Sequence, residues 1–243
     1  MTLPAALVTA AMSGREPTCY ANTQEANEWL CWQYVEDRRS EILDALVWHV
    51  QITLAALVLA TLLAFPLALL ARRLPRAESW VLGSATAIYT IPSLALFPLF
   101  LPFTGISATT VVLGLALYAL TVLVRAILDG LRAVPDEVRE SATGLGYGPG
   151  RLLLKVELPL ALPVIVAGLR VATVSTVALT TVGSLVERTY GGLGRLIAHG
   201  VDANFRAELV TASVLCVLLA LVLDAVLVVV QRLLTPWTRG ART

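Results

Sequence analysis

DGLRAVPDEVRESATGLGYGPGRLLLKVELP, residues 129–159, is a polar stretch between long apolar runs, and it decides how the rest of the chain is organised. Pro135 and the two acidic residues after it predict a helix start, because Pro suits the first helical position and acids counter the helix dipole. Gly144 and Gly146 predict the end of that helix. Pro149 predicts the start of a second short helix, which the proline at the end of the stretch should terminate. The sequence therefore predicts a compact helix–turn–helix in a water-exposed loop.

The composition is that of an integral membrane protein. Of the 243 residues, 57% are hydrophobic and 14% are charged, whereas a soluble domain carries about 25% charged residues. We expect an all-α, polytopic protein with about five transmembrane helices, the second of them bent by its prolines. The net charge of +1 gives no basic field for a nucleic-acid partner. The five apolar runs are Val47–Ala71, Trp80–Phe103, Ile106–Leu128, Leu160–Leu185 and Leu209–Val230.

Lysine and arginine are distributed unevenly between the two sides that these spans define. Eleven of these basic residues lie on the side that carries residues 129–159, and six lie on the other side. Because positive residues concentrate in cytoplasmic loops, we expect the N-terminus outside the cell and the C-terminus inside. The expected organisation is an extracytoplasmic segment at 1–45, a transmembrane domain at 46–235 and a cytoplasmic tail at 236–243.

The N-terminal segment is more polar than the rest of the chain. A short amphipathic helix is expected around Glu25–Arg38. Cys19 and Cys31 would meet an oxidising compartment on the outer side. We predict a disulfide between them, with two free thiols as the alternative.

Two charged residues lie deep inside expected spans, away from their ends, where charge is costly and is usually paired or functional. Arg170 lies about 16 Å along a helix from the end of the polar stretch, and Asp224 lies about 12 Å from the same side. Because their depths are similar, we expect the two side chains to pair. Such a pair either fixes helix packing or takes part in gating.

Small and hydroxyl residues are frequent in the fourth span, and the second span is broken by prolines. Small faces let helices approach closely, and hydroxyls also suit a wet path. We expect a transport pathway near these positions, with simple helix packing as the alternative. The candidate residues are Pro92, Ser93, Ser175, Thr176 and Thr180.

The sequence carries no signature of ATP hydrolysis, metal binding or covalent catalysis. A phosphate-binding loop needs Gly-Lys-Ser/Thr, but Lys155, the one lysine, lies between Leu154 and Val156. His49 and His199 are far apart in sequence, and His49 is interpreted as an interfacial residue. We therefore expect no catalytic residues and no cofactor, and energy has to come from a partner or an ion gradient.

The polar stretch resembles the EAA motif of bacterial ABC importer permeases, which runs Glu-Ala-Ala, three residues, Gly, nine residues, then Ile-x-Leu-Pro. Ser141 stands for Ala and Val156 for Ile, and both changes are conservative. The resemblance implies a type I (MetI-like) permease of the bacterial cell membrane that docks on a separate ATPase subunit. It also implies an extracytoplasmic substrate-binding protein, a second permease copy or paralogue, and surrounding lipid. The matching residues, expected to couple to the ATPase, are Glu140, Ser141, Ala142, Gly146, Val156, Leu158 and Pro159.

Two further stretches are similar to permeases of osmoprotectant importers, which carry glycine betaine, choline or carnitine. They are Tyr-Thr-Ile-Pro-Ser-Leu-Ala-Leu at 89–96 and Gly-Gly-Leu-Gly at 191–194. The resemblance covers about 47–231, and residues 187–190 depart from the family pattern. A quaternary ammonium permeant would favour aromatic side chains, and Phe97, Phe100, Phe103 and Tyr118 are candidates. The alternative functions are those of an ATP-independent secondary transporter or channel, or of a membrane enzyme. For residues 129–159 alone, the simpler interpretation is an ordinary cytoplasmic loop that contains a helix.

Overall fold

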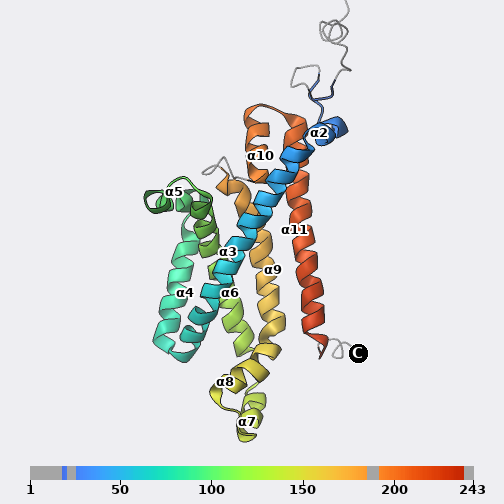
Figure 1. The fold of residues 1–243 in the computed structure, drawn as a ribbon. Coiled ribbons are helices and arrows are strands. Elements are labelled where there is room, and N and C mark those ends of the chain that lie inside the picture. The colour runs from blue at the N-terminus through green and yellow to red at the C-terminus, as the bar shows by residue number, and fades with distance from the viewer. Residues whose placement is uncertain (1–17, 21–25, 185–191, 238–243) are drawn as a thin grey trace, which may run out of the picture.

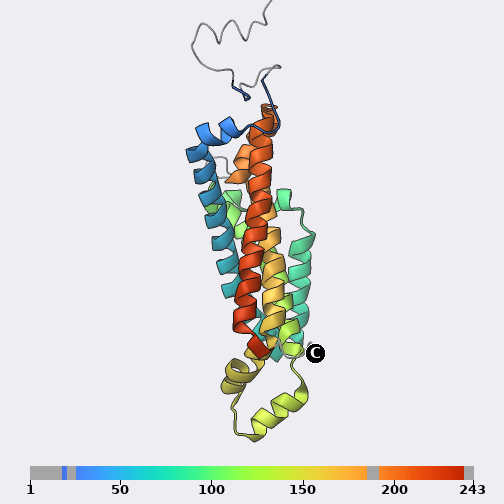
Figure 2. The same ribbon diagram turned by 90° about the vertical axis from the view of Figure 1, so that its right-hand side faces the viewer.

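Figure 1 shows a computed structural model of the chain, which describes residues 18–20, 26–184 and 192–237. Long helices form a bundle that carries α2 and α10 at one end and α7 and α8 at the other, as both side views show (Figures 1 and 2). The elements are α2 (Trp32–Asp37), α3 (Arg39–Arg73), α4 (Pro75–Thr90), α5 (Ser93–Thr104), α6 (Ala108–Arg132), α7 (Asp136–Gly144), α8 (Pro149–Leu152), the π-helical turn η1 (Leu153–Glu157), α9 (Leu158–Gly183), α10 (Leu193–Asp202) and α11 (Arg206–Leu234).

Within the described residues, four helices are long and apolar enough to cross a membrane. They are α3, α6, α11 and the continuous helix from α8 through α9. α4 and α5 meet at a bend of 103°, and counted together they would make a fifth crossing. The expected all-α fold with about five transmembrane helices is confirmed.

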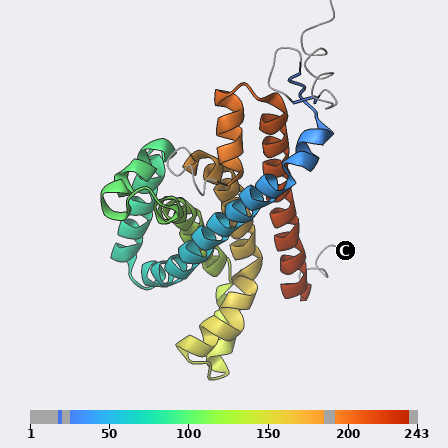
Figure 3. The same cartoon turned by 45° about the horizontal axis from the view of Figure 1, so that its top comes forward.

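α6 lies at the centre of the bundle. In its most apolar stretch 61% of the residues are buried, against 6% in α11. α6 packs chiefly against α9 and α3, and α3 crosses both obliquely (Figure 3). The exposed apolar side chains of α11 are those that lipid or another membrane helix would cover.

Small side chains allow this close packing. Along α3 the fully buried Ala56, Ala60, Ala64 and Ala68 follow one another at intervals of four residues and form a smooth stripe. Where α9 crosses α6, a Cβ atom on Gly168 would lie 2.1 Å from that of Ala126. The two backbones therefore approach more closely there than side chains at both positions would permit.

The break between α4 and α5 lies at Ile91 and Pro92, as the prolines of the second span predict. It frees the carbonyl of Ile91, which accepts a hydrogen bond from the hydroxyl of Tyr118 on α6. The backbone group is thus satisfied by a neighbouring helix, as apolar surroundings require.

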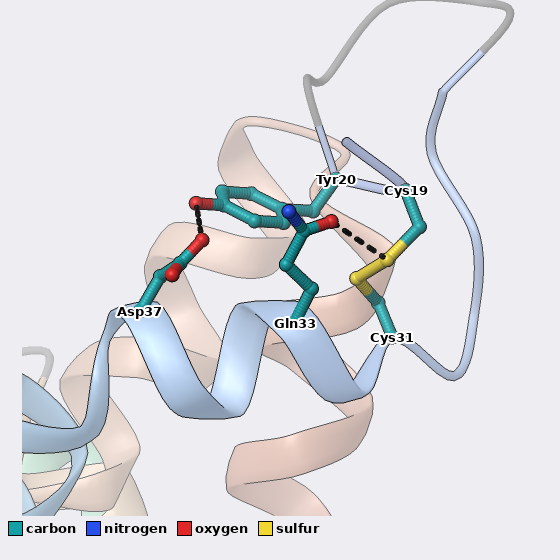
Figure 4. Close-up of a disulfide and its surroundings, with 5 residues drawn as sticks. All are labelled: Cys19, Tyr20, Cys31, Gln33 and Asp37. Carbon is teal, nitrogen blue, oxygen red and sulfur yellow. Dashed lines mark hydrogen bonds between the residues drawn. A yellow bond between two sulfur atoms is a disulfide. The ribbon is translucent and has the colours of Figure 1, made fainter. Parts of the chain in front are cut away.

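The N-terminal segment is attached to the turn between α10 and α11. Cys19 and Cys31 form a disulfide, with Cα atoms 5.9 Å apart (Figure 4). The amide of Asn27 donates to the carbonyl of Asn204 at 2.6 Å, and its oxygen accepts from the backbone N–H of Arg206 at 3.0 Å. Residues distant in sequence are therefore held together at this end of the bundle.

Two sequence-based expectations about helix limits are wrong. Pro159 does not end the second helix of the polar stretch, because the π-helical turn η1 precedes it and the helix continues to Gly183. A proline in the first turn of α9 is tolerated, since the turn before it rearranges the backbone hydrogen bonds. The amphipathic helix expected over Glu25–Arg38 is limited to α2 in the described residues, and 21–25 lie outside them. α10 is an additional helix of 10 residues, almost three turns, for which the sequence offers no expectation.

Candidate functional site

The predicted helix–turn–helix protrudes from the end of the bundle opposite α2 and α10 (Figures 1 and 2). α7 begins directly after Pro135 and carries Asp136 and Glu137 in its first turn, where acids counter the helix dipole. Four residues then lead to α8. The start of α7 thus agrees with the helix start that Pro135 and the two acidic residues predict.

Gly146 closes α7 with a backbone conformation that favours glycine. Its φ is +82°, and nothing lies within 4 Å of the position where a Cβ would stand. The N–H of Gly146 donates to the carbonyl of Thr143 at 2.9 Å, and that of Tyr147 donates to Ala142 at 3.1 Å. This pair of bonds is a Schellman motif, which satisfies the last carbonyls of the helix.

The EAA-like residues fall into two groups by exposure. Glu140, Ser141 and Gly146 are exposed, whereas Ala142 is buried. Leu145, next to the glycine, is 79% exposed at the tip of the protrusion. The outer surface of α7 is thus polar with one large apolar side chain, which suits a protein partner. The last three motif residues, Val156, Leu158 and Pro159, are half-buried where the helix enters the bundle.

A buried carboxylate that the sequence pattern did not reveal lies at the base of this protrusion. Glu157 is 2% exposed and accepts hydrogen bonds from both terminal nitrogens of Arg72, one of them at 2.7 Å. It also accepts from Nε of Arg139 at 2.9 Å. The signal in the sequence is an acidic residue between apolar neighbours at the start of a span, with arginines at the end of another.

Arg170 and Asp224 are brought together, as their depths predict. Nε and Nη2 of Arg170 donate to the two carboxylate oxygens of Asp224 at 2.7 and 2.9 Å. The side chains are 34% and 29% exposed, so the pair lies at the surface of the single chain. Gln231 donates to the carbonyl of Pro163 at 3.2 Å. Both contacts join α11 to α9.

Replacing Asp224 with Asn is expected to loosen α11, because the amide cannot accept the two charge-assisted bonds of Arg170. Arg170→Met should have the same effect, and the double variant should be more stable than the sum of the single changes predicts. The measurement is thermal unfolding of the purified protein in detergent for all four members of the cycle. Strictly additive losses would contradict a pairing that matters for stability.

The candidate pathway residues do not share one environment. Thr176 and Thr180 are buried, and the hydroxyl of Thr180 lies 3.2 Å from that of Thr53 on α3. In this arrangement they pack helices together, which favours the alternative of simple packing for both. Ser175 faces outward, and Pro92 is exposed beside the half-buried Ser93 at the α4–α5 break.

The aromatic candidates divide in the same way. Phe97 and Tyr118 are buried, and Phe97 lies against Gly114, where a Cβ would meet its ring at 2.6 Å. Phe100 is half-buried, and Phe103 is 85% exposed. Only the last of the four presents its whole ring to a molecule outside the single chain.

The interpretation of His49 as an interfacial residue is wrong. Its side chain is fully buried, and Nε2 lies 3.1 Å from the carbonyl of Val177 on α9. Gly192 allows the backbone to lie against this residue, because a Cβ there would be 2.8 Å from that of His49. The departures from the family pattern at 187–190 lie outside the described residues.

Comparison with solved structures shows which fold this is. The chain matches a permease chain in an inward-facing structure of the MetNI methionine ABC transporter, with a TM-score of 0.73 and 20% sequence identity. The match covers 80% of this chain and 96% of that one. The fold is that of an ABC transporter permease of the MetI-like type.

The chain belongs to the family of binding-protein-dependent transport system inner membrane components, whose model matches residues 56–240. It is 33% identical over 204 residues to the choline transport system permease protein OpuBB of Bacillus subtilis, which covers 84% of this chain and 93% of the relative. It is also 33% identical over 208 residues to the osmoprotectant import permease protein OsmW of Salmonella typhimurium, covering 84% and 96%. The protein is therefore a permease subunit of an ABC importer in a membrane, and such a permease subunit is not itself catalytic.

Proposed function

We propose that this permease carries a small quaternary ammonium osmoprotectant, such as choline or glycine betaine, into a bacterial cell. The observation that supports this most is the similarity, over most of the chain, to permeases named for choline and for osmoprotectants. The exposed ring of Tyr89, beside the α4–α5 break, and that of Phe103, near the end of α5, offer π-faces to a cation. Ser175 and Ser93 are the hydroxyl residues that we assign to the path.

We further propose that a separate ATPase subunit binds the exposed surface of α7, formed by Glu140, Ser141 and Leu145. The remaining motif residues hold α7 in place: Ala142 packs inward and Gly146 forms the turn. ATP-driven closure of the ATPase would push α7 and rock the helices that continue from it. The path then opens alternately to either side.

The orientation that we propose places the end with α2 and α10 outside the cell and the end with α7 in the cytoplasm. The described basic residues support it, because they are more numerous at the α7 end. The disulfide also fits an oxidising outer compartment. A substrate-binding protein would then approach α2 and α10, residues 1–45 would be extracytoplasmic, and 236–243 cytoplasmic. A second permease copy or paralogue would cover part of the exposed apolar surface of the bundle.

Uptake by the whole transporter tests the proposal. The permease is produced with its ATPase and binding protein in cells that lack their own importers, and uptake of labelled choline, glycine betaine, carnitine, ergothioneine and methionine is compared. We expect saturable uptake of quaternary ammonium compounds that is lost when the ATPase is inactivated. Preference for methionine would contradict the substrate class. Uptake that persists without the ATPase would instead favour a secondary transporter.

A further inference from the structure

α7 has few ways to pass a force to the rest of the molecule. Its one buried residue is Ala142, and short connections at 133–135 and 145–148 join it to its neighbours. Short helices with so little buried apolar surface are held weakly by packing alone. A lever that has to move membrane helices therefore needs another attachment.

Arg139 supplies this attachment from within α7. Its Nη2 donates to the carbonyl of Leu131, near the end of α6, at 2.6 Å. Its Nε donates to Glu157, directly before α9, at 2.9 Å, and its Nη1 donates to Asp136 of α7 itself at 2.6 Å. One guanidinium thus ties α7 to the ends of two membrane helices. A planar fork with fixed donors keeps that geometry better than an ammonium would.

Glu157 extends the connection to a third helix. Its carboxylate accepts hydrogen bonds from both terminal nitrogens of Arg72, which lies in the last turn of α3. The side chain of Glu157 is 3% exposed, and the side chains of Arg72 and Arg139 are 28% and 24% exposed. Glu157 is the last residue of η1, and π-helical turns occur frequently at functional sites.

A shielded carboxylate with two guanidinium partners resists separation. Charge-assisted hydrogen bonds are about twice as strong as neutral ones, and pulling Arg139 away leaves the buried carboxylate with only one of its two cationic partners. Displacing α7 should therefore move the ends of α3, α6 and α9 with it. These are the helices that pack most closely in the bundle core.

We propose that Arg72, Glu157 and Arg139 form a charged joint that transmits the movement of α7 to α3, α6 and α9, and that they act as positioning residues for coupling. The inference rests on the proposed docking of an ATPase on α7. It adds that coupling depends on residues that the docked partner does not touch.

Arg139→Gln is the most specific test, because it removes the bonds from α7 but leaves Glu157 paired with Arg72. The complete transporter, with ATPase and binding protein, is reconstituted in proteoliposomes, and substrate imported per ATP hydrolysed is measured. We expect this ratio to fall on the order of tenfold, which corresponds to the loss of a hydrogen bond to a charged group. Assembly with the ATPase and basal ATP hydrolysis should be retained. Glu157→Gln should act in the same direction, and the double variant should be no worse than the more affected single one.

Glu78→Gln is the matched control. Glu78 pairs with Arg132 at 2.5 Å on the same end of the bundle, but this pair joins α4 to α6 and does not involve α7. The import ratio of this variant should stay at the wild-type value. A wild-type ratio in both Arg139→Gln and Glu157→Gln would overturn the joint. If uptake by the wild-type transporter did not depend on ATP, this result would instead overturn the proposed function.

Discussion

Replacing Gly146 with valine is expected to lower ATP-driven uptake by a factor of roughly ten or more, while the protein still inserts into the membrane. The φ angle of Gly146 is +82°. A residue with a side chain is strained in this left-handed region, at a cost of about 1–2 kcal/mol of free energy. A β-branched residue is still less tolerated there. The turn that closes α7 would open, and the exposed surface beside Leu145 would lose its fixed direction. Uptake and ATP hydrolysis, measured in the same proteoliposomes, check this result.

The matched control is Gly148→Ala, two residues away in the same connection. Its φ is −71°, and nothing lies within 4 Å of its Cβ position, so alanine meets neither strain nor contact. Gly146→Asn should lie between valine and wild type, because Asn tolerates the left-handed conformation. Equal uptake by the valine and alanine variants would show that the turn geometry does not matter for coupling.

Replacing Gly168 with leucine is expected to destabilise the folded bundle more than any other change considered for this chain. A Cβ there would stand 2.1 Å from that of Ala126, so α9 and α6 would have to move apart where they cross. Overpacking of a close-packed core costs about 1–3 kcal/mol, and backbone separation raises the cost to the upper end. A loss of about 3 kcal/mol lowers the melting temperature by roughly 6–12 °C in a chain of this size. The measurement is thermal unfolding in detergent, together with the yield of monodisperse protein.

Gly83→Leu controls for the change of residue type, because no atom lies within 4 Å of a Cβ at that position on α4. It should unfold near the wild-type temperature. Gly168→Ala alone should be moderately destabilising, and Ala126→Gly in the same chain should restore part of the loss by returning the missing space. If Gly168→Leu melted with wild type, the close crossing of α6 and α9 would not hold in the folded protein.

The sequence predicts those parts of the fold that depend on local chemistry. Length and hydropathy locate the long helices, prolines locate the α4–α5 break, and Pro135 and Gly146 mark the two ends of α7. The pairing of Arg170 with Asp224 also follows locally, because helical rise gives each residue a depth.

Features that depend on tertiary contacts could not be predicted in this way. Glu157 looks like an ordinary polar residue until the ends of α3 and α7 bring Arg72 and Arg139 to it. His49 resembles an interfacial residue until the backbone of Gly192 lies against it. Pro159 reads as a helix terminator because a π-helical turn has no sequence signal that competes with proline.

The central claim is that a separate ATPase contacts the exposed surface of α7, and site-specific photo-crosslinking tests it most directly. A photoreactive amino acid is placed at Ser141, on α7, or at Val201, which is 62% exposed on α10 at the opposite end of the bundle. Cells that produce the complete transporter are then irradiated. We predict that the permease with the probe at Ser141 is covalently joined to the ATPase subunit and that the one with the probe at Val201 is not. Crosslinks to the ATPase from Val201 but not from Ser141 would contradict the account.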